Sequence, residues 1–108
     1  MQSGTMHRLY IGGRYGSNHE RAGELIYNFE SDVERLAARH LMGGTVLLGT
    51  GLWEGQDEPC AIVETLIDNG VDKEREEAKV LTLAEALKVR FTQDAIMHTT
   101  TEIGFSFV

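Results

Sequence analysis

The order in which two periodicities alternate along the chain constrains its fold most. Residues 7–11, 45–53, 60–68 and 94–108 have the two-residue alternation or the β-branched composition of strands. Residues 31–41 and 80–91 carry apolar side chains at three- and four-residue spacing, the period of an amphipathic helix. The order strand, helix, strand, strand, helix, strand predicts an α+β ferredoxin-like sandwich (βαββαβ), with two helices on one face of a four-stranded antiparallel sheet.

Two element boundaries stay open in this prediction. Ser31 followed by Glu34 is typical of a capping box and favours a first helix that begins at Ser31. The apolar stripe of that helix, however, extends back to Ile26. The segment before the second stripe, residues 72–79, is heavily charged and is expected to form solvated first turns of the helix.

Size and charge exclude several classes of protein. A chain of 108 residues fits one domain, with residues 1–5 as a flexible leader. A net charge of −7 disfavours general nucleic-acid binding and contact with anionic membranes. The single cysteine, Cys60, permits no internal disulfide and is expected to be a packed, unreactive thiol. No signal peptide or membrane span is visible, so we expect a cytoplasmic protein.

Several short motifs, in this order, resemble a group of small, poorly characterised bacterial and phage-encoded ferredoxin-like proteins. They are Tyr10-Ile11-Gly12, Gly44-Thr45-Val46, Gly49-Thr50-Gly51-Leu52-Trp53, Glu58-Pro59 and Gln93-Asp94-Ala95-Ile96-Met97. The charged stretch at residues 72–77 is longer than that pattern has. The resemblance supports the fold, implies no catalytic residue, and suggests an accessory protein of phage origin.

The glycine-rich segment of residues 12–21 is the leading candidate for ligand binding. Backbone amides between a strand and a helix can hold an anion, and an arginine can grip a phosphate with two hydrogen bonds. We expect Arg14 and Arg21 to meet such a group, Tyr15 to stack on a planar ligand and Asn18 to read its edge. The segment matches neither the phosphate-binding loop nor the dinucleotide fingerprint, and a mobile surface loop is the alternative.

Three further positions carry alternatives. Trp53, after two strand glycines, could stack on a ligand, anchor an interface or pack in the core. His7 and His98 could meet across neighbouring first and last strands, although no histidine spacing is typical of a metal site. Glu64 lies on the expected central strand and, if buried, should be salt-bridged.

Taken together, these features predict a non-enzymatic protein that binds or sequesters a nucleotide-like anion at an oligomer interface, without a cofactor or metal. The alternatives are a cofactor-free enzyme of the dimeric α+β barrel type, with His98 or His7 as base, and a protein–protein inhibitor. We expect a homo-oligomer because one face of the sheet carries apolar residues and no helix. Phe105 and Phe107 alternate up to the end of the chain and are expected to be buried.

Overall fold

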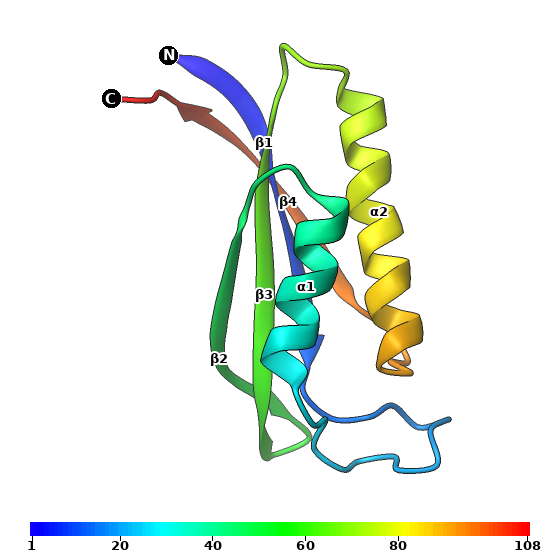
Figure 1. Cartoon of the computed structure of the whole chain (residues 1–108). Coiled ribbons are helices and arrows are strands. Elements are labelled where there is room, and N and C mark those ends of the chain that lie inside the picture. Colours follow the sequence, from blue (N-terminus) through cyan, green and yellow to red (C-terminus); the bar gives the residue numbers. More distant parts are fainter.

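The computed structural model describes residues 1–108 as one sheet with two helices (Figure 1). The elements, in chain order, are β1 (Gln2–Gly12), α1 (Phe29–His40), β2 (Thr45–Trp53), β3 (Gln56–Asp68), α2 (Lys73–Arg90) and β4 (Met97–Phe105). No helix is long and apolar enough to cross a lipid bilayer.

The sheet has the strand order β2-β3-β1-β4, and all neighbouring strands are antiparallel. Both helices lie on the same side of it, and the two chain ends lie together at one end of the molecule (Figure 1). The α+β ferredoxin-like sandwich expected from the sequence is therefore confirmed. β3 and β1 are the central strands, and β2 and β4 are the edges.

The core lies between the sheet and the helices because each strand sends every second side chain to that side. β1 contributes Leu9 and Ile11, and β3 contributes Ala61, Val63 and Ile67. The helices cover them with a cluster of fully or almost fully buried side chains, which includes Val33, Leu36, Val80, Leu83, Leu87 and Phe91. The other face of the sheet carries no helix, and we call it the open face.

The structure corrects two expected starts. β1 begins at Gln2 rather than His7, so the segment expected to be a flexible leader is part of the sheet. Its backbone pairs with the ends of both β3 and β4, partners that local sequence cannot reveal. α1 begins at Phe29 rather than Ser31, after Asn28 in the left-handed conformation, and Ser31 donates its hydroxyl to the Asn28 carbonyl.

Two further corrections concern segments near turns and ends. The connection expected at residues 54–59 shrinks to a two-residue hairpin turn, in which Glu54 and Gly55 both have positive φ. Phe105 was expected to be buried and is half-buried, whereas Phe107 follows the end of β4 and is 86% exposed. A two-residue alternation past the end of a strand therefore did not indicate burial.

Candidate functional site

A pocket of about 560 Å³ lies along the part of β3 that β2 does not cover. Pairing between these strands stops at Thr45 and Glu64, and β3 continues to Asp68 with its edge free on that side. The loop after α1, the start of α2 and the chain end after β4 complete the walls. The volume lies within the range of pockets that hold small organic ligands.

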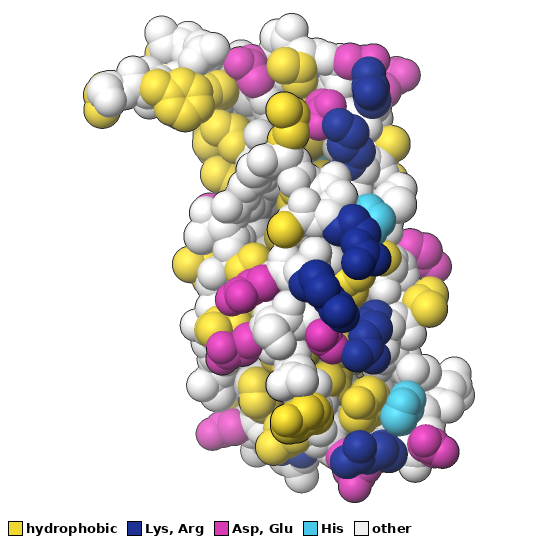
Figure 2. All heavy atoms as spheres, in the orientation of Figure 1, with side chains coloured by type: hydrophobic (Ala, Val, Ile, Leu, Met, Phe, Trp, Pro, Cys, Tyr) yellow, Lys and Arg dark blue, Asp and Glu magenta, His cyan; other side chains and the backbone are white.

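The charged groups of this pocket are all acidic. Glu64 and Asp68 lie on β3, Glu76 lies on α2, and no Lys or Arg belongs to the lining. Most Lys and Arg side chains lie instead on the surface of the helices, where Figure 2 shows them gathered. Glu76 is ion-paired with Lys79, and Glu64 is ion-paired with Arg8. Asp68 is therefore the lining carboxylate without a cationic partner. Acidic groups in a partly desolvated cleft favour a cation over an anion, because like charges there repel.

Glu64 is held in place on the open face by a salt bridge. Its Oε2 accepts a hydrogen bond from Arg8 Nε at 2.8 Å, and the two side chains are 24% and 34% exposed. Glu64 is thus half-buried rather than buried, and it is salt-bridged. Because Arg8 is on β1, the contact also fixes the carboxylate relative to the middle of the sheet.

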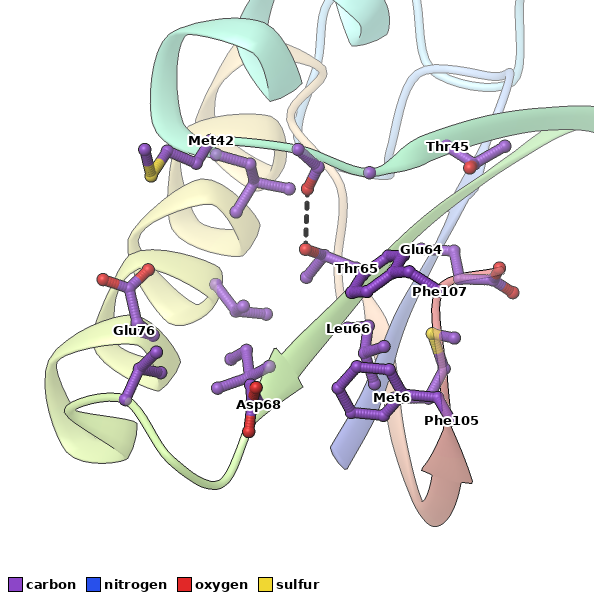
Figure 3. Close-up of a pocket in the computed structure, with 16 residues that line it drawn as sticks. Met6, Met42, Thr45, Glu64, Thr65, Leu66, Asp68, Glu76, Phe105 and Phe107 are labelled. Atoms are coloured by element: carbon purple, nitrogen blue, oxygen red, sulfur yellow. Dashed lines mark hydrogen bonds between the residues drawn. The ribbon is translucent and has the colours of Figure 1, made fainter. Parts of the chain in front are cut away.

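The rest of the lining is mostly apolar. Phe105 and Phe107, from the chain end, lie beside Met6 and Leu66 (Figure 3). On the side of the helices, the Thr65 hydroxyl donates a 2.7 Å hydrogen bond to the Gly43 carbonyl and ties the loop after α1 to β3. Aromatic rings near carboxylates form a surface that suits a ligand with a planar group and a positive charge.

A second polar cluster lies under α2, outside the lining of this pocket. His7 Nδ1 and His98 Nε2 are 2.8 Å apart, so the two histidines meet across β1 and β4 as the sequence suggested. His7 is 2% exposed, and its Nε2 is buried without a hydrogen-bond partner. Burial and then the neighbouring His98 lower the pKa of His7, which keeps the imidazole neutral.

The glycine-rich loop lies at the opposite end of β1 and is ordered by its own side chains. Arg14 donates to the Gly23 carbonyl at 2.9 Å, and Arg21 pairs with Glu24. Arg21 also lies 5.9 Å from the ring centre of Tyr15. The structure thus brings Tyr15 and Arg21 together, while Asn18 is exposed at a turn. Ligand binding by these four residues stays a prediction.

Trp53 ends β2 and is 70% exposed, so the core alternative is wrong for this residue in a single chain. It lies on the open face with Thr45, an even number of residues earlier on the strand. Its stacking or interface role stays a prediction.

Sequence reasoning missed most of the pocket. Glu64 was singled out because it interrupts an apolar strand, but Asp68 and Glu76 look like ordinary strand-end and helix-surface acids. Asp68 and Glu76 face the same space only because β3 extends beyond its pairing with β2 and α2 starts beside that part of β3. The expected strands gave no signal of this, because residues 45–53 and 60–68 are equal in length and would pair from end to end. Cys60 is half-buried, and burial raises the pKa of its thiol, as expected for an unreactive cysteine.

Comparison with known proteins points to one kind of structure. No protein-family model matches the chain, and no curated protein matches it significantly. Among solved structures, a phage SAM lyase in complex with S-methyl-5′-thioadenosine has a TM-score of 0.67 and 21% sequence identity, covering 92% of this chain and 81% of its own. A phage SAM lyase in its apo state has a TM-score of 0.64 and 21% identity, covering 93% and 81%. At this identity the likeness shows a shared fold.

These comparisons contradict the non-enzymatic binding protein expected from the sequence, because both structural neighbours are enzymes. The sequence interpretation was wrong because it took the lack of a catalytic motif as a sign of a binding protein. An enzyme that works by positioning its substrate needs no short sequence motif. The expected relation to small phage proteins agrees with the neighbours at that coarse level.

Proposed function

We propose that this chain is a lyase that acts on S-adenosylmethionine (SAM) in the acidic pocket beside β3. The observation that carries the proposal is the lining: three carboxylates, two phenylalanines and no basic side chain. SAM carries a sulfonium and an ammonium group, so its net charge at neutral pH is positive. The likeness to phage SAM lyases adds support from the fold.

The proposed reaction cleaves one carbon–sulfur bond of SAM. The bond from sulfur to the four-carbon amino-acid chain breaks, and its electron pair stays on sulfur in S-methyl-5′-thioadenosine. The carbon that loses sulfur either receives an oxygen of the substrate's own carboxylate and closes a lactone, or becomes part of an alkene as a base takes the neighbouring proton. Neither route consumes water.

The pocket residues fit a binding and orienting role. Carboxylates near the sulfonium attract the substrate but cannot by that contact speed the reaction, because the positive charge on sulfur disappears in the transition state. Rate enhancement would come from holding the four-carbon chain in a reactive conformation, which can contribute several kcal/mol. We assign Glu64, fixed by Arg8, and Asp68 to the charged groups of the substrate, and Phe105 to its planar base.

The test is incubation of the purified full chain with SAM, followed by chromatography for S-methyl-5′-thioadenosine and mass spectrometry of the four-carbon product. In water enriched in oxygen-18 we expect no label in that product. Glu64→Gln should lose activity, and Glu85→Gln, an exposed change on α2 outside the pocket, should not. Absence of S-methyl-5′-thioadenosine from the parent reaction would reject the proposal.

A further inference from the structure

The edge strand β2 lacks the usual protection against intermolecular pairing. All nine of its residues are uncharged, none is proline, and most are exposed. Leu47 and Leu48 are 46% and 48% exposed, and Leu52 and Trp53 are 77% and 70% exposed. Natural sheets normally protect such edges with charges, prolines or bulges, so an unprotected edge indicates a strand that pairs with another chain. The other edge, β4, carries His98 and Glu102.

The backbone groups of β2 that face outward can be identified. Gly13 N–H donates to the Pro59 carbonyl, so the backbone of Pro59 points toward β1 and away from its β2 partner, Thr50. Thr50 therefore belongs to a pair that β3 does not hydrogen-bond, and its own N–H and C=O point out of the sheet. The same holds for Val46, Leu48 and Leu52, which alternate with it.

We propose that β2 pairs antiparallel with β2 of a second copy, in a two-fold register centred on Gly49, and that each copy thereby places its Trp53 at the other copy's acidic pocket. This register engages all nine residues and lets the outward-facing groups meet in about eight hydrogen bonds. The part that concerns the pocket rests on the proposed function.

Side-chain sizes and charges favour this register. It sets Trp53 opposite Thr45 and Leu47 opposite Gly51, so on the open face each large side chain meets a small one. No like charges meet, because the strand has none. The hairpin tip with Glu54 reaches the loop that follows the last turn of α1, whose basic residues are Arg39 and His40. A second copy is therefore the occupant that the strand's own sequence fits.

The pairing completes the proposed site. Thr45 lines the pocket and pairs with Glu64 on β3. Thr45, Glu64 and Trp53 all lie on the open face. Trp53 of the second copy lies two strand spacings from Glu64, about 10 Å, with only the small Thr45 between them. A nucleoside base that enters the pocket between these side chains could stack on the indole. This accounts for an exposed tryptophan at the end of a strand.

Charged substitutions on β2 test the pairing between the two copies. Leu48 and Thr50 of opposite copies face each other in this register, so L48K/T50K sets lysines against lysines, whereas L48K/T50E sets each lysine against a glutamate. We expect light scattering to give a dimer for the parent, a monomer for L48K/T50K and a dimer for L48K/T50E, with circular dichroism confirming that all three are folded. A monomeric parent at micromolar concentration, or the same mass for both variants, would overturn the proposal.

The contribution of Trp53 is tested by mixing two impaired chains. Trp53→Ala and Glu64→Gln should each be a weak enzyme, since each homodimer lacks one part of both sites. After subunit exchange, a mixed dimer has one complete site, so an equal mixture should recover about a quarter of the parental activity. Recovery no greater than the average of the two separate activities would overturn the shared site. If the parent makes no S-methyl-5′-thioadenosine, the lyase proposal fails, while the charge experiment still decides the pairing.

Discussion

The two faces of the sheet differ in composition and in role. The face under the helices is mostly apolar, and the buried polar residues of its strands are Thr5, His7 and Thr65. The open face carries the Arg8–Glu64 salt bridge, half-buried apolar residues such as Tyr10 and Ile62, and one side of the pocket. One face therefore holds the fold together, and the other is available for ligands and partners. Substitutions on the two faces should separate stability from activity.

The largest effect is expected from the covered face. Phe91→Ala removes a fully buried ring that packs against Phe29 with ring centres 5.5 Å apart. Such a cavity typically lowers the free energy of unfolding by about 3–5 kcal/mol. Urea denaturation of the variant and of Val89→Ala, an exposed neighbour on α2, measures the difference. Equal loss in both variants would show that Phe91 does not support the core as described.

The open face should respond in activity instead. Glu64→Gln keeps the shape of the side chain but removes its charge, and a lost charge-assisted contact of 1.5–3 kcal/mol corresponds to about a 10- to 100-fold fall in kcat/KM. We expect the fall to appear mainly in KM, with unfolding free energy changed by less than about 1 kcal/mol. Steady-state kinetics with SAM and thermal melts give both values. A change confined to kcat would contradict a binding role for Glu64.

The pH dependence of stability should trace to His7. Its pKa is lowered in the folded state, so the unfolded chain takes up the proton at higher pH than the folded chain does. The stabilisation is thus complete above the unfolded pKa of about 6.5 and is lost as the pH falls below it. Melting curves between pH 7.5 and 5.5 should show a declining Tm in the parent and a flatter profile in His7→Leu. His40→Gln, at the end of α1, should keep the parental slope.

The smallest effect is expected at the loop, far from both the core and the pocket. Arg14→Ala removes the hydrogen bond to the Gly23 carbonyl and should cost about 0.5–1.5 kcal/mol of stability. Lyase activity should stay at the parental level, because Arg14 lies beyond the end of β1 opposite the pocket. A large loss of activity with little loss of stability would indicate that the lyase site lies at the loop instead of the pocket.

Periodicity was enough to predict the fold, since each element buries one face of a regular pattern. Thr45–Trp53 was predicted with its observed ends. The start of β1 was missed because a strand paired on both sides needs no amphipathic signal of its own, and its first residues, Gln2 and Ser3, look like a polar tail.

The site could be predicted only in fragments. The meeting of His7 with His98 followed from strand order, and the salt bridge of Glu64 followed from the cost of burying a carboxylate. The pocket itself depends on where β2 stops relative to β3, a register property that no local pattern encodes. The arginines drew attention to the loop, although most of its charged groups are used within the loop itself.

The position of β4 has a consequence for how the protein is made. β1 leaves the ribosome before β2, β3 and β4, yet one of its two neighbours is β4, which leaves after the other three, and Gln2 pairs with Phe105. A nascent chain can close the β2–β3 hairpin early, because a two-residue turn joins those strands. It cannot cover the outer edge of β1, or bring His98 to His7, until β4 has been synthesised. Ribosome-bound chains that stop before β4 should therefore leave one edge of β1 unpaired and exposed, and we expect them to depend on chaperones.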